Sequence, residues 1–235
     1  MSKALVLGST GLVGSFILST LTTGPSSPFS SIEIIARRSA AAAKGSSLPV
    51  NEFIEKDTTK WASHLSSTSP APSVMFSGLA TTRAAAGGFE NQYKIEHDLN
   101  IELAKAAKAA GTKTYVLISA SGANAHSMFG YVKMKGEIEE HIKEIGFEHT
   151  IIVQPGLIIG HREESRFAEG IAQSLASAIG KIHGGLKDSW AQDADVIAKA
   201  AVSAAIKVEK GEVKDKVWVL KQKDIVQLGA KGWTT

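Results

Sequence analysis

The chain has 235 residues, of which 43% are hydrophobic and 21% charged, with a formal net charge of +3. This composition suffices for one continuous hydrophobic core and excludes a disordered, charge-rich chain. The absence of cysteine excludes disulfides, zinc–cysteine sites and thiol nucleophiles. The small positive charge forms no basic stripe interleaved with aromatic residues, so nucleic-acid binding is not expected.

Short apolar runs bounded by turn residues predict seven strands, at residues 4–7, 32–36, 53–54, 74–79, 115–118, 150–153 and 217–220. Between them, helical periodicity predicts helices over 13–21, 61–65 (a single turn), 90–110, 131–145, 165–180 and 193–208. Residues 39–47, rich in alanine and serine, are expected to form a loop or weak helix. Alternating buried strands and amphipathic helices indicate an α/β fold: a single doubly wound Rossmann-type parallel sheet with helices on both faces. One domain, 1–235, is expected, with 157–192 as a small cap on the substrate side.

No segment is expected to cross a membrane. Glycines interrupt the apolar, uncharged stretch 4–21, whereas a spanning helix needs about 20 predominantly apolar residues. The seven histidines include no H-x-x-x-H or H-E-x-x-H pair, so no metal site is expected either.

A glycine-rich segment follows the first predicted strand and precedes the first helix. It has the pattern G-x-x-G-x-x-G and comprises Gly8, Ser9, Thr10, Gly11, Leu12, Val13 and Gly14. Glycines in this context permit a tight turn, close approach of the backbone to a pyrophosphate, and close helix–strand packing. The helix N-terminus supplies amide donors for the anion. The segment therefore predicts a dinucleotide site.

Arg37 and Arg38 end the second predicted strand, where NAD-binding proteins usually place an acidic residue that binds the ribose 2′-hydroxyl. Guanidinium groups pair with a 2′-phosphate, which a carboxylate would repel. NADP(H) is therefore the predicted cofactor, with one arginine expected to be a surface charge. Asp57, after the third strand, is interpreted as either an adenine contact or a cap.

Tyr131 and Lys135 lie four residues apart and therefore on one face of the predicted helix 131–145. An ammonium beside a phenol favours proton transfer from the phenol, which suits an acid–base catalyst. Ser119 and Ser121 close the preceding strand at the carboxyl edge, where a hydroxyl could orient a substrate carbonyl. Four glutamates of this helix are expected to form its solvated face: Glu137, Glu139, Glu140 and Glu144.

Together with Pro155-Gly156, these motifs resemble the atypical short-chain dehydrogenase/reductase superfamily. More specifically, the chain resembles a fungal mitochondrial outer-membrane protein family related to the Tat-interacting oxidoreductase, through residues 79–88 (LATTRAAAGG), 92–95, 97–100 and 129–139 (FGYVKMKGEIE). The resemblance implies an NADP(H)-binding Rossmann fold attached peripherally to the outer membrane. It also implies cofactor contacts from Leu79, Ala80, Thr81, Tyr131, Lys135, Pro155, Gly156 and Leu157.

The chain departs from that family at two positions. Ala120 replaces the second of two consecutive serines, so either Ser119 or Ser121 must take the serine role. Gln154 stands where arginine is common. The leading hypothesis is an NADPH-dependent reductase of a small carbonyl or enone, with Tyr131 as acid and Lys135 holding the ribose. The alternative is a non-catalytic NADP(H) sensor that acts through a protein partner at the mitochondrial surface.

Overall fold

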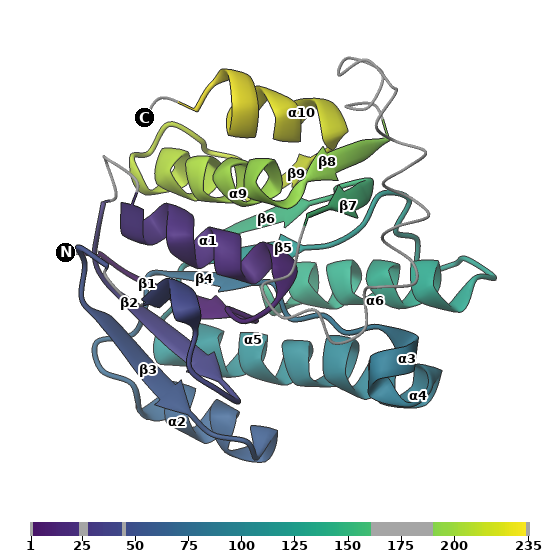
Figure 1. The fold of residues 1–235 in the computed structure, drawn as a ribbon, viewed down its shortest axis with the longest axis horizontal. Helices are drawn as coiled ribbons and strands as arrows, with labels where there is room; N and C mark the ends of the chain where they lie inside the picture. The colour runs from purple at the N-terminus through teal and green to yellow at the C-terminus, as the bar shows by residue number, and fades with distance from the viewer. Residues whose placement is uncertain (1, 24–27, 44–45, 161–189, 234–235) are drawn as a thin grey trace.

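The computed structural model describes residues 2–23, 28–43, 46–160 and 190–233 (Figure 1). Seven strands form one sheet in which every neighbouring pair is parallel. Their order is β3 (Val50–Ile54), β2 (Phe29–Ala36), β1 (Ser2–Leu7), β4 (Val74–Ser77), β5 (Thr114–Ile118), β6 (His149–Val153) and β9 (Val217–Leu220). These are the seven strands that the sequence predicts, although β4 ends two residues early. The doubly wound α/β fold is thus confirmed.

The central strands bury side chains on both faces, which explains their nearly continuous apolar sequences. In β1, Ala4 and Val6 join one hydrophobic cluster, while Leu5 and Leu7 join the cluster on the opposite face. Helices α1 (Leu12–Thr23), α9 (Ala194–Glu209) and α10 (Gln222–Val226) cover the first face. Helices α2 (Trp61–Ser67), α5 (Leu99–Ala110) and α6 (Gly130–Ile145) cover the other (Figure 1).

The predicted helix 90–110 is interrupted. It consists of α4 (Phe89–Tyr93), a π-helical turn (Lys94–Asp98) and α5, and a short helix α3 (Arg83–Ala86) precedes it. The wider π turn changes the register of the buried face. Glu96 and His97 are buried, while Ile95, expected on the core face, is only partly buried.

The remaining elements are short. They are 3₁₀ turns at Ala41–Ala43 and Thr58–Lys60, a second π-helical turn at Gln227–Lys231, and a separate two-stranded parallel sheet. That sheet pairs β7 (Leu157–Ile159) with β8 (Ala191–Asp193), two strands that the sequence did not predict. The small cap expected at 157–192 therefore has described structure only at its ends, and the predicted helix 165–180 lies outside the described residues.

Strand β1 lies at the centre of the sheet, between β2 and β4. The chain leaves β1 toward β2 and β3 and later returns to β4, so the connections from β1 and β4 lead in opposite directions. In open α/β sheets, such a switch point creates the crevice in which ligands bind at the carboxyl ends of the strands.

Candidate functional site

Two glycines at the turn from β1 into α1 leave no space for a side chain. Gly8 has φ of +72°, and a Cβ there would lie 2.5 Å from the carbonyl oxygen of Gly78. A Cβ at Gly14 would overlap the carbonyl oxygen of Gly8. Gly11, whose amide donates to that same oxygen at 2.8 Å, is less crowded, with a Cβ position 3.1 Å away. Gly8 and Gly14 are thus required for packing, whereas a Cβ at Gly11 would need a smaller adjustment of the backbone.

The hydroxyl of Ser9 indicates what this loop can hold. The residue is only 1% exposed, and among the described residues its Oγ has no hydrogen-bond partner. A buried polar atom without a partner is uncommon and suggests that a ligand completes it. Phosphate oxygens accept such hydrogen bonds together with those from the amides at a helix N-terminus. The loop therefore fits the pyrophosphate of a dinucleotide.

Arg37 and Arg38 directly follow β2, and both are exposed at the carboxyl edge of the sheet. Asp57, after β3, caps the turn Thr58–Lys60, where its Oδ1 accepts from the amide of Thr59 at 3.1 Å and from its hydroxyl at 2.6 Å. These hydrogen bonds, first that of the Thr59 hydroxyl, lower the pKa of the Asp57 carboxyl. Of the two interpretations of Asp57, the cap agrees with its contacts, and the adenine contact stays a prediction.

Tyr131 and Lys135 occupy the first turns of α6 but differ in environment. Tyr131 is 47% exposed, whereas Lys135 is 4% exposed. The Lys135 Nζ atom lies 3.0 Å from Oε2 of Glu96, which is itself 1% exposed. The lysine is therefore one half of a buried ion pair between α6 and the π-helical turn.

Glu96 also connects this pair to the segment after β4. Its Oε1 accepts from the amide of Thr81 at 3.1 Å and from Nε2 of Gln92 at 2.9 Å. The Gln92 amide donates in addition to the carbonyl oxygen of Thr81, at 3.1 Å. The structure thus joins two groups of predicted site residues, Leu79–Ala80–Thr81 and Tyr131–Lys135, through a carboxylate.

The two candidate serines have opposite hydrogen-bonding roles. Ser119 is buried, and its hydroxyl donates to Oε1 of Glu139 at 2.5 Å. Ser121 is exposed, and its Oγ accepts from Nε2 of Gln222 at 2.6 Å. A hydroxyl has one hydrogen, so that of Ser119 is already engaged, while the bond to Gln222 leaves the hydrogen of Ser121 unused.

The backbone of residues 155–157 forms hydrogen bonds at the start of the small sheet and with Ser121. The carbonyl oxygen of Pro155 accepts from the amide of Ser121 at 2.7 Å, and the amide of Gly156 donates to Oε1 of Gln192 at 2.7 Å. The Leu157 amide donates to the carbonyl oxygen of Trp190 at 2.8 Å. The predicted cofactor contacts of Pro155, Gly156 and Leu157 stay predictions.

Glu139 was expected on the solvated face of α6, and that expectation is wrong. Its side chain is buried, and both of its oxygens accept from Nε2 of Gln154, at 2.9 and 3.0 Å. The spacing of Tyr131, Lys135 and Glu139, four residues apart each time, places all three on one face and could have revealed this. Sequence reasoning also missed Gln92, in the short helix α4, and Glu96, in the π-helical turn, which has no clear periodic signature.

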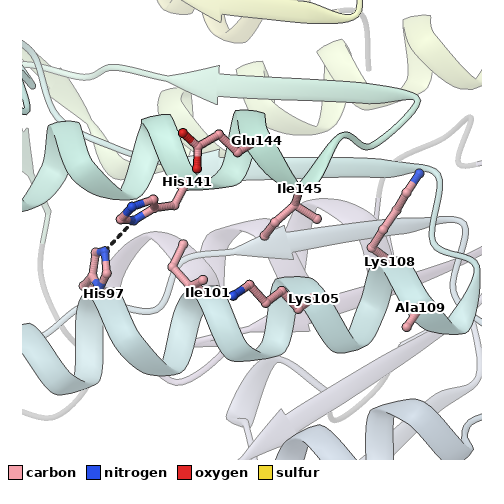
Figure 2. Close-up of a pocket in the computed structure, with 8 residues that line it drawn as sticks. All are labelled: His97, Ile101, Lys105, Lys108, Ala109, His141, Glu144 and Ile145. Atoms are coloured by element: carbon pink, nitrogen blue, oxygen red, sulfur yellow. Dashed lines mark hydrogen bonds between the residues drawn. The ribbon is translucent and has the colours of Figure 1, made fainter.

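A hollow of about 560 Å³ lies between α5 and α6 (Figure 2). At one end, Nε2 of His97 lies 2.8 Å from Nδ1 of His141, while Nδ1 of His97 lies 2.8 Å from a carboxylate oxygen of Asp98. Lys105, Glu144 and Ile145 also line it. Because it reaches the last turns of both helices, it lies away from the Tyr131 end of α6.

Two kinds of feature are absent from the described part of the chain. It contains no group of three or more His, Cys, Asp or Glu residues able to hold a metal ion. None of its helices combines the length and apolar character that crossing a membrane requires.

Solved structures share the fold of this chain at low sequence identity. The UDP-Glc/GlcNAc 4-epimerase from Campylobacter jejuni has a TM-score of 0.68 at 14% identity, and the match covers 97% of this chain and 82% of the epimerase. MoeE5 in complex with UDP-glucose and NAD has a TM-score of 0.66 at 16% identity and covers 98% and 81%. The fold and its glycine loop define a Rossmann-type protein with the architecture of these nucleotide-sugar enzymes.

No protein-family model matches the chain, but full-length relatives are known in fungi. "Protein fmp52, mitochondrial" of Aspergillus niger is 56% identical, over 97% of this chain and 99% of the relative. "Protein fmp-52, mitochondrial" of Neurospora crassa is 46% identical, over 99% and 97%. The chain therefore belongs to the Fmp52 family of fungal mitochondrial proteins. This confirms the resemblance to a fungal mitochondrial family, whereas the outer-membrane location and the relation to the Tat-interacting oxidoreductase stay predictions.

Proposed function

We propose that this protein is an NADP(H)-binding short-chain dehydrogenase/reductase that reduces a small carbonyl or enone substrate. One observation carries the proposal: the glycine loop and the Tyr131–Lys135 pair are physically connected at the carboxyl edge of the sheet. Gly8 packs on Gly78, three residues before Thr81, whose amide shares the Glu96 carboxylate with Lys135. A dinucleotide held by the loop would extend toward the tyrosine and lysine.

The cofactor proposal has two supports. The compared structure of MoeE5 contains NAD, which favours a nicotinamide dinucleotide here. Arg37 and Arg38, exposed after β2, favour the 2′-phosphate of NADP(H), because guanidinium groups bind phosphate with charge-assisted hydrogen bonds.

Each side chain of the site would have a separate role in the reaction. When bound, NADPH supplies the hydride. Tyr131, with its ring half-exposed at the start of α6, donates the proton to the substrate oxygen, and the Lys135 ammonium holds the ribose hydroxyls. Ser121 takes the serine role, because the Gln222 amide orients its oxygen and its hydrogen stays available to a substrate carbonyl.

A non-catalytic NADP(H) sensor that acts through a protein partner is the second candidate. It is favoured by the engagement of Ser119, whose only hydroxyl hydrogen is donated to Glu139. The two candidates differ in one measurable respect, since a sensor binds the nucleotide without oxidising it.

Tyr131→Phe tests the proposal. Turnover of NADPH with a panel of small carbonyl and enone substrates should fall by about 10²–10⁴, the usual contribution of a positioned general acid. NADPH affinity should change little, because the ring remains. Tyr93→Phe is the matched control, since Tyr93 donates instead to Glu137 on the flank of α6. Turnover that survives Tyr131→Phe would contradict the mechanism, and nucleotide binding without any turnover would favour the sensor.

Titrations of the unmodified protein with NADPH and with NADH test the choice of cofactor. NADPH should bind at least about tenfold more tightly than NADH, a difference of about 1.4 kcal/mol. Equal affinities would contradict the role given to Arg37 and Arg38.

The proposed location is the outer mitochondrial membrane, with peripheral attachment. Its support is the mitochondrial designation of the Fmp52 relatives. Protease treatment of intact mitochondria tests this location, because a protein on the outer surface would be digested while matrix proteins survive.

A further inference from the structure

Glu96 is a buried acid that the proposed chemistry does not use. It lies in the π-helical turn Lys94–Asp98, between α4 and α5, and is 1% exposed. Single π-helical turns interrupt helices rarely and are frequent at functional sites. Here the turn directs a carboxylate into the protein, where a regular helix would have continued the apolar stripe that Ile95 begins.

The two oxygens of this carboxylate have different partners. Oε1 accepts from the Thr81 amide and from Gln92, which fixes the side chain and ties it to the segment after β4. Oε2 lies 3.0 Å from the Lys135 Nζ atom as an ion pair and has no hydrogen-bond partner among the described residues. One oxygen is thus anchored, and the other is presented to the lysine.

We propose that Glu96 is the positioning residue for Lys135, fixing its ammonium beside residues 79–81 so that both groups meet the nicotinamide-side ribose. This inference rests on the proposed function. Its physical basis is the cost of burying a charge: the ammonium of a lysine residue that is 4% exposed needs a counter-charge in a fixed place. Without the carboxylate, the flexible lysine stem would turn toward solvent and leave the ribose site.

Glu96→Gln is the direct test. The substitution keeps the shape of the side chain and the bond to Thr81 but removes the charge that faces Lys135. Affinity for NADPH, followed by cofactor fluorescence, should fall about tenfold or more. The loss should be equal for NADH, because the two cofactors share the nicotinamide-side ribose. Affinities within about twofold of those of the unmodified protein would overturn the inference.

A double-variant cycle separates positioning from a general structural role. Lys135→Met should itself weaken cofactor binding, and adding Glu96→Gln to it should change the affinity by about twofold at most. This follows because Glu96 acts on the ribose only through the lysine. Equal further losses in the presence and absence of Lys135 would show that Glu96 serves the site in another way, and would overturn the inference.

The matched control is Glu137→Gln, which removes a glutamate that faces a lysine, Lys133, at 3.7 Å on the more exposed side of α6. It should leave cofactor affinity unchanged. If circular dichroism shows that Glu96→Gln does not fold, Glu96→Asp is the second variant, because it keeps the charge but withdraws it by one methylene. A loss of cofactor affinity in Glu96→Asp supports the inference, and unchanged affinity opposes it. Failure of the unmodified protein to bind NADPH or NADH would refute the proposed function itself, a distinct outcome.

Discussion

Two of the site residues predicted from the sequence, Lys135 and Ser119, are each held by a buried carboxylate. The Lys135 ammonium faces Glu96, and the Ser119 hydroxyl donates to Glu139. Both contacts lie below the surface from which Tyr131 projects, so they shape the site without occupying its opening. Tyr131 and Ser121, the two residues proposed to contact the substrate, are exposed.

Substitutions of the two serines are expected to have different effects, one on turnover and the other on stability. Ser121→Ala removes the hydroxyl hydrogen available to a substrate carbonyl, and turnover should fall by about 10²-fold or more, as for the loss of an oxyanion donor. Ser119→Ala instead removes a donor from the buried Glu139 and should lower the free energy of unfolding by about 1–3 kcal/mol, with a smaller effect on turnover. Urea titrations and initial rates for both variants measure the difference. A large rate loss confined to Ser119→Ala would reverse the assignment.

At the scale of residues, the sequence predicts which residues belong to the site better than it predicts which residues they contact. Tyr131, Lys135 and the glycines are recognisable because their spacing along the chain carries the signal. Glu96 is 39 positions from Lys135, and Gln222 is 101 from Ser121, so these contacts depend on how separate elements pack. No local pattern encodes such distances, which is why these two partners emerge only from the structure.

At the scale of elements, the glycine loop packs β1, α1 and the end of β4 closely against one another. Gly8 and Gly14 bring backbone against backbone, and Gly78, at the end of β4, completes the contact, with a Cβ position 3.3 Å from Gly14. The same three elements border the crevice at the switch point of the sheet. Packing therefore depends on Gly8 and Gly14, while Gly11 is the glycine proposed to approach the cofactor.

Substitutions in the loop separate these two roles. Gly14→Ala forces a Cβ onto the carbonyl oxygen of Gly8, so α1 must shift, and the thermal midpoint should fall along with cofactor affinity. Gly11→Val should disturb the fold less, because its Cβ position is 3.1 Å from that oxygen and needs a smaller shift than at Gly14, but it should obstruct the approach of a pyrophosphate. Thermal melts and cofactor titrations distinguish the two. Retained cofactor binding in Gly11→Val would show that the dinucleotide lies elsewhere.

Elements with a strong periodic signal are the ones that the sequence predicts. All seven strands of the main sheet and the helices α6 and α9 agree within a few residues. The π-helical turn at Lys94–Asp98 and the three-residue strands β7 and β8 were missed. A π turn shifts the period locally, and strands of three residues are too short to show alternation.

At the scale of the whole molecule, the sheet separates two hydrophobic clusters, and one of them includes hydrogen-bonded tyrosines. The cluster beneath α5 and α6 contains Tyr115, whose hydroxyl donates to Oδ1 of the buried Asn100 at 2.6 Å. Ser77 donates to the same oxygen at 2.8 Å. Tyr93, at the edge of this cluster, donates to Glu137. Two of the three tyrosines of the chain are thus held in their neutral form by this half of the molecule.

This arrangement predicts instability at alkaline pH. Burial raises the pKa of Tyr115 far above its usual value, and burial followed by the hydrogen bond to Glu137 raises the pKa of Tyr93 to about 12. An unfolded tyrosine ionises near pH 10. Below that pH both residues are neutral in the folded and unfolded states, so their contribution to stability is complete. As the pH rises from about 10 toward 12, the unfolded chain loses protons that the folded protein retains, and stability falls, by about 1.4 kcal/mol per pH unit for Tyr115.

Urea unfolding at several pH values between 8 and about 11 measures this decline. In Tyr93→Phe/Tyr115→Phe the steeper fall above pH 10 should largely disappear, because phenylalanine cannot ionise. The substitution at Tyr115 is expected to be tolerated at neutral pH, since Ser77 still donates to Asn100. An equally steep alkaline decline in this double variant would mean that groups other than these two tyrosines control alkaline unfolding.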